Sequence, residues 1–118
     1  MPRHARLDTT GALHHIMARG INKGALFQDD LDRMKFRERL ESCIVETKCS
    51  VYAWVLMDNH VHLLVRSGAK PVAILMRKLL TWYAVYYNRR HHRSGYLFEN
   101  RYKSVLGPLH PSQPGEGR

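Results

Sequence analysis

A hairpin signal in the middle of the chain constrains the fold more than any other feature. The runs SVYAWVLM (50–57) and HVHLLVRS (60–67) are rich in β-branched and aromatic residues, which favour strands. The two residues between them, Asp58 and Asn59, are turn formers. Two such runs joined by a short turn predict two antiparallel strands, and the rest of the chain must complete a sheet around them.

The segments on either side of this hairpin predict an α+β protein. ALHHIMAR (12–19) predicts a strand, and residues 31–47 predict a helix that follows the capping pair Asp29–Asp30. Residues 71–90 predict a second helix, and YLFENRYKSVL (96–106) alternates well enough for a fourth strand. The order β-α-β-β-α-β predicts the ferredoxin-like fold, a four-stranded antiparallel sheet with two helices on one face.

Length and composition indicate one folded unit followed by a tail. A chain of 118 residues is long enough for a single hydrophobic core and too short for two. Residues 107–118, GPLHPSQPGEGR, contain three prolines and three glycines and show no apolar periodicity. We therefore expect a domain over residues 1–106 and a disordered or irregular tail over residues 107–118.

The charge balance indicates a polyanionic partner. Nineteen lysines and arginines against ten acidic residues give a formal net charge of +9 and a pI near 10.0, which favours nucleic acid. An anionic membrane surface is the alternative. However, the apolar runs are far shorter than a bilayer span, and no signal-peptide pattern opens the chain. We therefore expect a cytoplasmic protein that does not enter the membrane.

Two histidines in the predicted hairpin form a candidate metal site. Residues two apart on a strand face the same way, so His60 and His62 should project together, while Val61 and Leu63 face the core. Neutral imidazoles on a rigid strand can hold a divalent cation, which in turn polarises a phosphoryl oxygen. By spacing alone, two polar surface side chains are the commoner explanation of this pattern, and a metal would need a third ligand.

Several segments together resemble a known family of enzymes. DNHVHLLV (58–65), residues 75–104, the opening MPRHAR (1–6), HHIMARG (14–20) and YAWVLMDNHVH (52–62) resemble the single-tyrosine HUH transposases. These small insertion-sequence and REP-associated enzymes cut and rejoin single-stranded DNA. The resemblance implies a ferredoxin-like fold and a partner that is single-stranded or hairpin DNA. It also implies that His60 and His62 hold a divalent metal, Mg²⁺ or Mn²⁺.

The resemblance also implies a tyrosine nucleophile that this chain does not offer at the expected place. In the family, a tyrosine on a helix after the fourth strand attacks the scissile phosphate and forms a 5′-phosphotyrosine. Residues 105–118 contain no tyrosine and too many prolines for a helix. We therefore expect a C-terminally truncated relative with no certain catalytic residue, and without the tyrosine helix we expect it to be inactive. Tyr102 is the reserve candidate.

Basic residues throughout the chain are candidates for contacts with DNA phosphates. For each of them, a solvated surface charge is the alternative explanation. The prediction of DNA binding therefore rests on how many basic residues there are. The predicted contacts are Arg3, Arg6, Arg19, Lys23, Arg77, Lys78, Arg89, Arg90, Arg93, Arg101 and Lys103.

Three functions remain open from the sequence. The first is a transposase-type protein that binds single-stranded or hairpin DNA, with cleavage and joining as the resemblance implies. The second is a non-catalytic single-stranded nucleic-acid-binding module that uses the exposed sheet. The third is a metal-dependent nuclease that uses water. The missing helix should also leave apolar sheet surface exposed, so we expect self-association, with a homodimer as one form.

Overall fold

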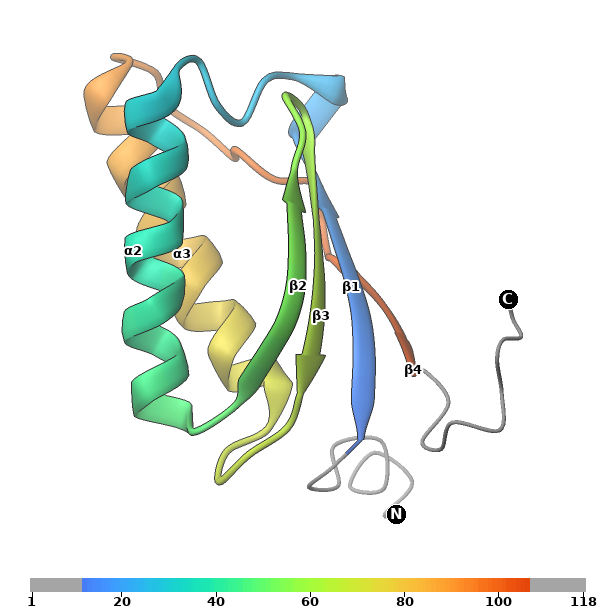
Figure 1. Ribbon diagram of the computed structural model, residues 1–118. Coiled ribbons are helices and arrows are strands. Elements are labelled where there is room, and N and C mark those ends of the chain that lie inside the picture. The colour runs from blue at the N-terminus through green and yellow to red at the C-terminus, as the bar shows by residue number, and fades with distance from the viewer. Residues whose placement is uncertain (1–11, 107–118) are drawn as a thin grey trace.

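The computed structural model describes residues 12–106, which form a four-stranded antiparallel sheet with two helices packed on one face (Figure 1). The spatial order of the strands is β2-β3-β1-β4. These observations confirm the predicted α+β, ferredoxin-like arrangement. Along the chain, the elements are β1 (Leu13–Arg19), η1 (Ile21–Lys23), α2 (Asp30–Thr47), β2 (Ser50–Leu56), β3 (His60–Arg66), α3 (Val72–Arg90) and β4 (Lys103–Leu106).

The predicted hairpin is β2 and β3. It is closed by the Met57 N–H, which donates to the His60 carbonyl at 2.8 Å. β3 lies between β2 and β1, so its backbone is hydrogen-bonded on both sides. Strand alternation buries Val61, Leu63 and Val65, each at most 1% exposed. Like β1, this strand is internal to the sheet, and it provides a rigid base for the side chains on its other face.

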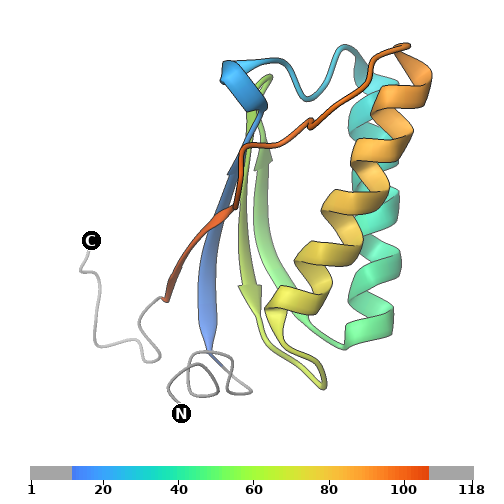
Figure 2. The ribbon, with the colours of Figure 1, turned by 180° about the vertical axis from the view of Figure 1, so that it is seen from behind.

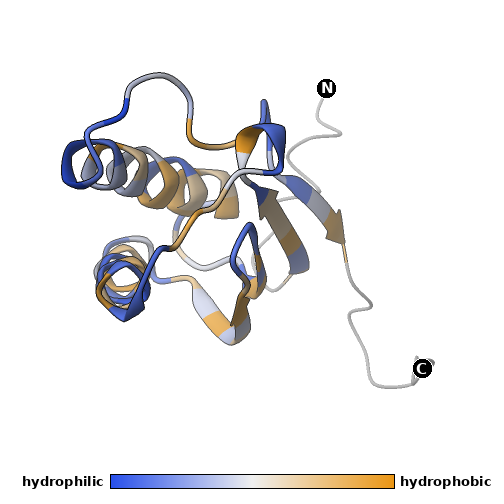
Figure 3. Cartoon of the chain, turned by 90° about the horizontal axis from the view of Figure 1, so that it is seen from above, coloured by the Kyte–Doolittle hydropathy of each residue, from blue (hydrophilic) through white to orange (hydrophobic). Residues whose placement is uncertain are grey.

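The helices form one layer over the sheet, and the core fills the space between. Apolar residues at helical spacing face inward, as the fully buried Phe36 and Cys43 of α2 and Leu75, Leu79 and Tyr83 of α3 show. Seen from behind and from above, neither helix covers the opposite face of the sheet (Figures 2 and 3). No helix within residues 12–106 is both long enough and apolar enough to cross a lipid bilayer.

The helix boundaries follow the capping signals. Asp29 has an extended backbone, and its side chain accepts a hydrogen bond from the Asp32 N–H at 3.1 Å, as expected for an N-cap. α2 therefore begins at Asp30, one residue before the predicted start. It ends at Thr47, and the C-cap residue Lys48 has a left-handed φ of 61°. Pro71 directly precedes α3.

The fourth strand is shorter than predicted. It begins at Lys103 rather than at residue 96, because the segment before it is fixed to the end of β1 by separate hydrogen bonds. The Ile21 N–H donates to the Leu97 carbonyl and the Glu99 N–H donates to the Arg19 carbonyl, both at 2.9 Å. Leu97 is 3% exposed and belongs to the core. Because Leu97 is held in the core, the residues around it do not continue as a regular strand, although their sequence alternates. Only the last four residues form a ladder with β1.

Candidate metal-binding and nucleic-acid-binding face

The two predicted metal ligands lie side by side on the face of the sheet that neither helix covers, here called the open face. Val61 is buried in the core, so the flanking His60 and His62 point the opposite way. Their ring centroids are 5.0 Å apart. His15 of β1 has its ring centroid 5.4 Å from that of His62. The structure thus brings three imidazoles together on one face.

The side chain of Asn59 determines which nitrogen of His60 is available to a ligand. His60 Nδ1 lies 2.9 Å from Asn59 Oδ1, and because a carbonyl oxygen only accepts, Nδ1 is the donor. The loop after β1 holds Asn59 in place. The Gly20 N–H donates to the Asn59 carbonyl at 2.9 Å, and the Asn59 Nδ2 donates to the Lys23 carbonyl at 3.5 Å. The lone pair of His60 Nε2 is therefore left for a ligand.

The surroundings of His62 favour the neutral form that a metal ligand must have. Its Nδ1 is buried and has no hydrogen-bond partner among residues 12–106. Burial is the main cause that lowers the pKa of His62, and repulsion from His60 and His15 adds to it. A lowered pKa means that His62 keeps a free lone pair at neutral pH.

Two imidazoles on a rigid strand fit part of the coordination sphere of a divalent cation. Within residues 12–106, no group of three histidine, cysteine or carboxylate side chains is placed to hold a metal ion. A cation on His60 and His62 keeps several positions for water and phosphate oxygens. The donor set therefore suits a cation shared with a bound phosphate, in contrast to a closed structural site with four protein ligands.

Two of the predicted DNA-contacting residues lie at the His60 end of the open face. Arg19 is the partner of His60 across the ladder between β1 and β3, and its guanidinium lies 3.9 Å from the Glu99 carboxylate. Lys23 is exposed and lines a shallow pocket at the β2–β3 turn together with His60. Both are close enough to His60 to act on the same ligand.

Two further cationic side chains, Lys103 and Arg66, lie on this face, and Arg66 was not among the residues predicted from the sequence. Lys103 is the partner of Met17, which is also the partner of His62, so Lys103 projects from the same side. Arg66 lies on β3 at the same period of two as His60 and His62. The alternation that selected the histidines, continued to the end of the strand, was the signal for Arg66.

Other predicted contacts are used within the helix layer. Arg90 Nη2 lies 2.6 Å from Asp29 Oδ2, and Arg90 Nη1 lies 2.7 Å from Asp32 Oδ1. Lys78 of α3 lies 3.7 Å from the carboxylate of Glu46 of α2. These side chains hold the two helices together, away from the histidines.

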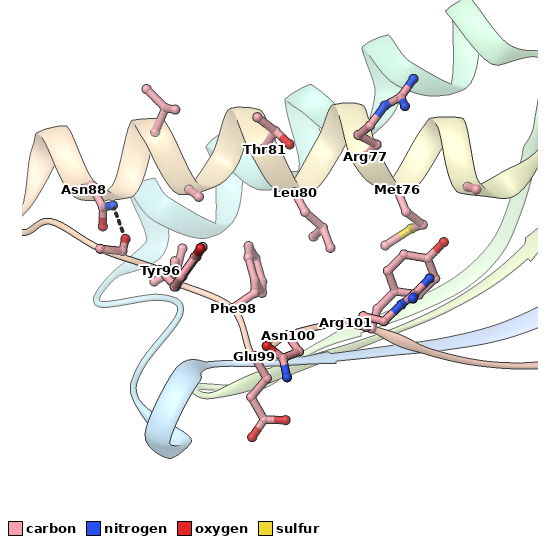
Figure 4. Close-up of a pocket in the computed structure, with 16 residues that line it drawn as sticks. Met76, Arg77, Leu80, Thr81, Asn88, Tyr96, Phe98, Glu99, Asn100 and Arg101 are labelled. Atoms are coloured by element: carbon pink, nitrogen blue, oxygen red, sulfur yellow. Dashed lines mark hydrogen bonds between the residues drawn. The ribbon is translucent and has the colours of Figure 1, made fainter.

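A groove of about 540 Å³ beside α3 contains another group of predicted residues (Figure 4). Leu80 and Phe98 point into it from α3 and from the segment before β4, and Arg77 and Arg101 also line it. Tyr102 lines it as well and packs against the core. The groove lies on the helix side of the sheet, so the structure gives no support to Tyr102 as a nucleophile beside the histidines.

The remaining predicted contacts are separate from both sites. Arg89 is exposed near the end of α3. Arg93 donates to Asn88 Oδ1 at 2.6 Å and closes the turn after α3. Arg3 and Arg6, like the predicted tail, lie outside the described residues.

Comparisons with known proteins agree with the fold. The family model described as "Transposase IS200 like" matches residues 9–106. Among solved structures, a protein of Deinococcus radiodurans R1 assigned as a transposase has a TM-score of 0.65 and 14% identity, covering 88% of this chain and 85% of its own. A REP-associated tyrosine transposase bound to a REP hairpin has a TM-score of 0.69 and 11% identity. That match covers 91% of this chain and 62% of its own.

A comparison with curated proteins gave no significant match. The structural matches, at identities this low, establish the fold alone. The family model spans most of the sequence, including all of the strands and helices described above. On that evidence, the chain belongs to the IS200-like transposase family.

Proposed function

We propose that this chain binds single-stranded or hairpin DNA across the open face, as the DNA-binding part of a transposase. The observation that carries the proposal is the His60–His62 pair, whose rings lie 5.0 Å apart on the face that neither helix covers. The formal net charge of +9 favours a polyanionic ligand. Membership of a transposase family supports DNA as that ligand.

We infer that His60 and His62 hold a divalent cation, Mg²⁺ or Mn²⁺, against a phosphate of the bound strand. When bound, such a cation polarises a phosphoryl oxygen. His60 presents Nε2 because Asn59 holds its Nδ1. Arg19 and Lys103 flank the pair on β1 and β4, where each can neutralise a neighbouring phosphate.

Cleavage and joining through a phosphotyrosine, as the resemblance implies, needs a tyrosine hydroxyl at the scissile phosphate. Tyr83 and Tyr87 are buried in the core, at 0% and 2% exposed. Tyr86 donates its hydroxyl hydrogen to Asp32 at 2.9 Å, and Tyr102 lines the groove beside α3. None of these four hydroxyls is presented on the open face. Tyr96 also lines the groove beside α3, and Tyr52 lies against Arg66 at the end of β3 far from His60. The proposal for the described residues is therefore confined to binding DNA and a metal ion.

A structural relative supports hairpin DNA as the ligand. The REP-associated tyrosine transposase of similar fold was solved bound to a REP hairpin. This chain spans 62% of the length of that relative, so the activities of the longer protein are proposals here.

Fluorescence anisotropy with labelled hairpin and single-stranded oligonucleotides tests the proposal. We expect tighter binding in Mn²⁺ than in EDTA, and we expect His60→Ala and His62→Ala to remove that difference. His92→Ala is the control, because His92 is exposed in the turn after α3. The affinity should also fall with salt, with a logarithmic slope of about 0.7 per phosphate contacted on a single strand.

Other outcomes identify other functions. Binding that is indifferent to EDTA and to His60→Ala would identify a non-catalytic nucleic-acid-binding module. Metal-dependent cleavage without a covalent protein–DNA adduct would identify a nuclease that uses water. Failure of the wild-type chain to bind either form of DNA would refute the proposal.

We also propose that copies of the chain associate in solution, as a homodimer. β4 is an edge strand, and its Val105 and Leu106 are 64% and 42% exposed. An apolar edge strand is a template for pairing with another chain. Light scattering should show a mass that rises with concentration toward twice that of the monomer. A monomer at every concentration would contradict this expectation.

A further inference from the structure

A β-bulge in β2 introduces an exposed aromatic side chain at the end of the sheet far from the histidine pair. Val51 is the partner of Val65 and Ala53 is the partner of Leu64, so Tyr52 is an extra residue that β3 does not match. Tyr52 is 56% exposed. Bulges often redirect a side chain beside a functional site, and this one leaves a large aromatic ring in solvent.

The ring of Tyr52 meets a guanidinium on the open face. Arg66 follows the buried Val65, so it shares the face of His60 and His62, and its Cζ lies 5.4 Å from the Tyr52 ring centroid. No ion pair within residues 12–106 includes Arg66, and its Nε has no hydrogen-bond partner there. The described part of the protein therefore leaves this positive charge without a counter-ion.

The outward row of β3 connects this pair to the histidines. His60 and Arg66 are six residues apart on the strand, which is about 20 Å at about 3.3 Å per residue. Leu64 lies between them, with Ala53 as its partner on β2 and His15 as its partner on β1, so the surface between the two ends carries apolar side chains and one further imidazole. A stacked single strand with a rise of about 3.4 Å covers that distance with roughly six nucleotides.

We propose that Tyr52 and Arg66 form a second nucleotide subsite, in which a base stacks on the Tyr52 ring and the adjoining phosphate pairs with Arg66. The strand then runs along β3, with one phosphate at His60 and His62 and another at Arg66. The proposal rests on the proposed function, because it places the same DNA strand on the same face. An aromatic ring beside an unneutralised guanidinium suits an unpaired base with its phosphate.

Anisotropy with an oligonucleotide of about ten nucleotides, long enough to reach both ends of β3, tests this subsite. Tyr52→Ala should weaken binding roughly 5- to 140-fold, the range for loss of one base–aromatic stack. Tyr52→Phe keeps the ring and should bind like the wild type. Arg66→Gln should weaken binding and reduce the logarithmic salt slope by about one contact. Arg37→Gln, an exposed arginine on α2, is the matched charge control.

Two further measurements separate this subsite from the histidine pair and from the fold. Calorimetric titration with Mn²⁺ should give the same affinity for Tyr52→Ala as for the wild type. Circular dichroism should show the same unfolding midpoint, within the small effect of a surface change. If the wild type binds the oligonucleotide but Tyr52→Ala and Arg66→Gln bind equally well, the subsite is refuted and the proposed function stands. If the wild type does not bind, the proposed function itself fails.

Discussion

The Asp32 carboxylate joins the start of α2 to the end of α3, and replacing it measures how much this junction stabilises the fold. Asp32 is 0% exposed. Its Oδ1 accepts from the Tyr86 hydroxyl at 2.9 Å and from Arg90 at 2.7 Å. Its Oδ2 accepts from the Gln28 N–H at 2.9 Å and lies 2.9 Å from His91 Nε2. Asp32→Asn keeps the shape but leaves one accepting oxygen where there were two.

The expected loss of stability follows from these contacts. If the new amide nitrogen replaces Oδ2, it faces the Gln28 N–H; if it replaces Oδ1, it faces Arg90. One buried donor left unsatisfied costs about 1–3 kcal/mol, and a lost bond between charged groups costs about 1.5–3 kcal/mol. Arg90 keeps its ion pair with Asp29 at 2.6 Å, which limits the loss. We expect the free energy of unfolding to fall by about 3 kcal/mol, at the lower end for a broken buried pair.

Denaturant unfolding followed by circular dichroism measures this difference directly. In a thermal melt, the same loss should lower Tm by roughly 10–20 °C for a domain of this size. Asp30→Asn is the matched control, because Asp30 lies in the same turn but is exposed. Its ion pair with Arg33 is long, at 3.8 Å, so its loss should change the free energy of unfolding by no more than about 0.5 kcal/mol. An Asp32→Asn variant within about 1 kcal/mol of the wild type would refute the reasoning.

Three more predictions concern stability. Burial raises the pKa of Asp32, but hydrogen bonds outweigh it and hold that pKa below its ordinary value of 3.8. The carboxylate therefore adds stability at neutral pH that is lost in acid, and the difference in unfolding free energy from Asp32→Asn should shrink below about pH 4. Gly68→Ala should unfold at a markedly lower midpoint concentration of denaturant, because a Cβ there would lie 1.7 Å from the Lys48 carbonyl oxygen. Tyr83→Phe should cost about 1 kcal/mol in the same assay, because it removes a 2.6 Å hydrogen bond to the Leu26 carbonyl.

Much of the fold was predictable because local signals and burial agree. Strand alternation and the Asp58–Asn59 turn defined the hairpin, and Asp29 acts as the predicted N-cap. The fourth strand was predicted too long because alternation cannot distinguish a strand from an irregular segment fixed at one buried residue. Leu97 is that residue, and its burial depends on contacts with elements far away in the sequence.

The candidate site was predictable only where it depends on periodicity. Alternation put His60 and His62 on one face, but the hydrogen bond that orients His60 needs Asn59, which is held by a loop some forty residues earlier in the chain. For the basic residues, too, the sequence does not show which long-range contacts each side chain makes. A net charge does not reveal that Arg90 is neutralised by Asp29 and Asp32 across the helix layer.

Most of the cations on the open face have no carboxylate partner within residues 12–106. On the helix side, Lys78 meets Glu46 and Arg90 meets two carboxylates, whereas Arg37, Arg77 and Arg89 have no ion pair within residues 12–106. On the open face, Lys103 and Arg66 have no ion pair within residues 12–106, and only Arg19 has a carboxylate nearby, at 3.9 Å in a half-exposed setting. An exposed pair of this kind contributes little and exchanges readily. A polyanion therefore meets unneutralised charge on the face that carries the histidines, although the excess charge is spread along the whole sequence.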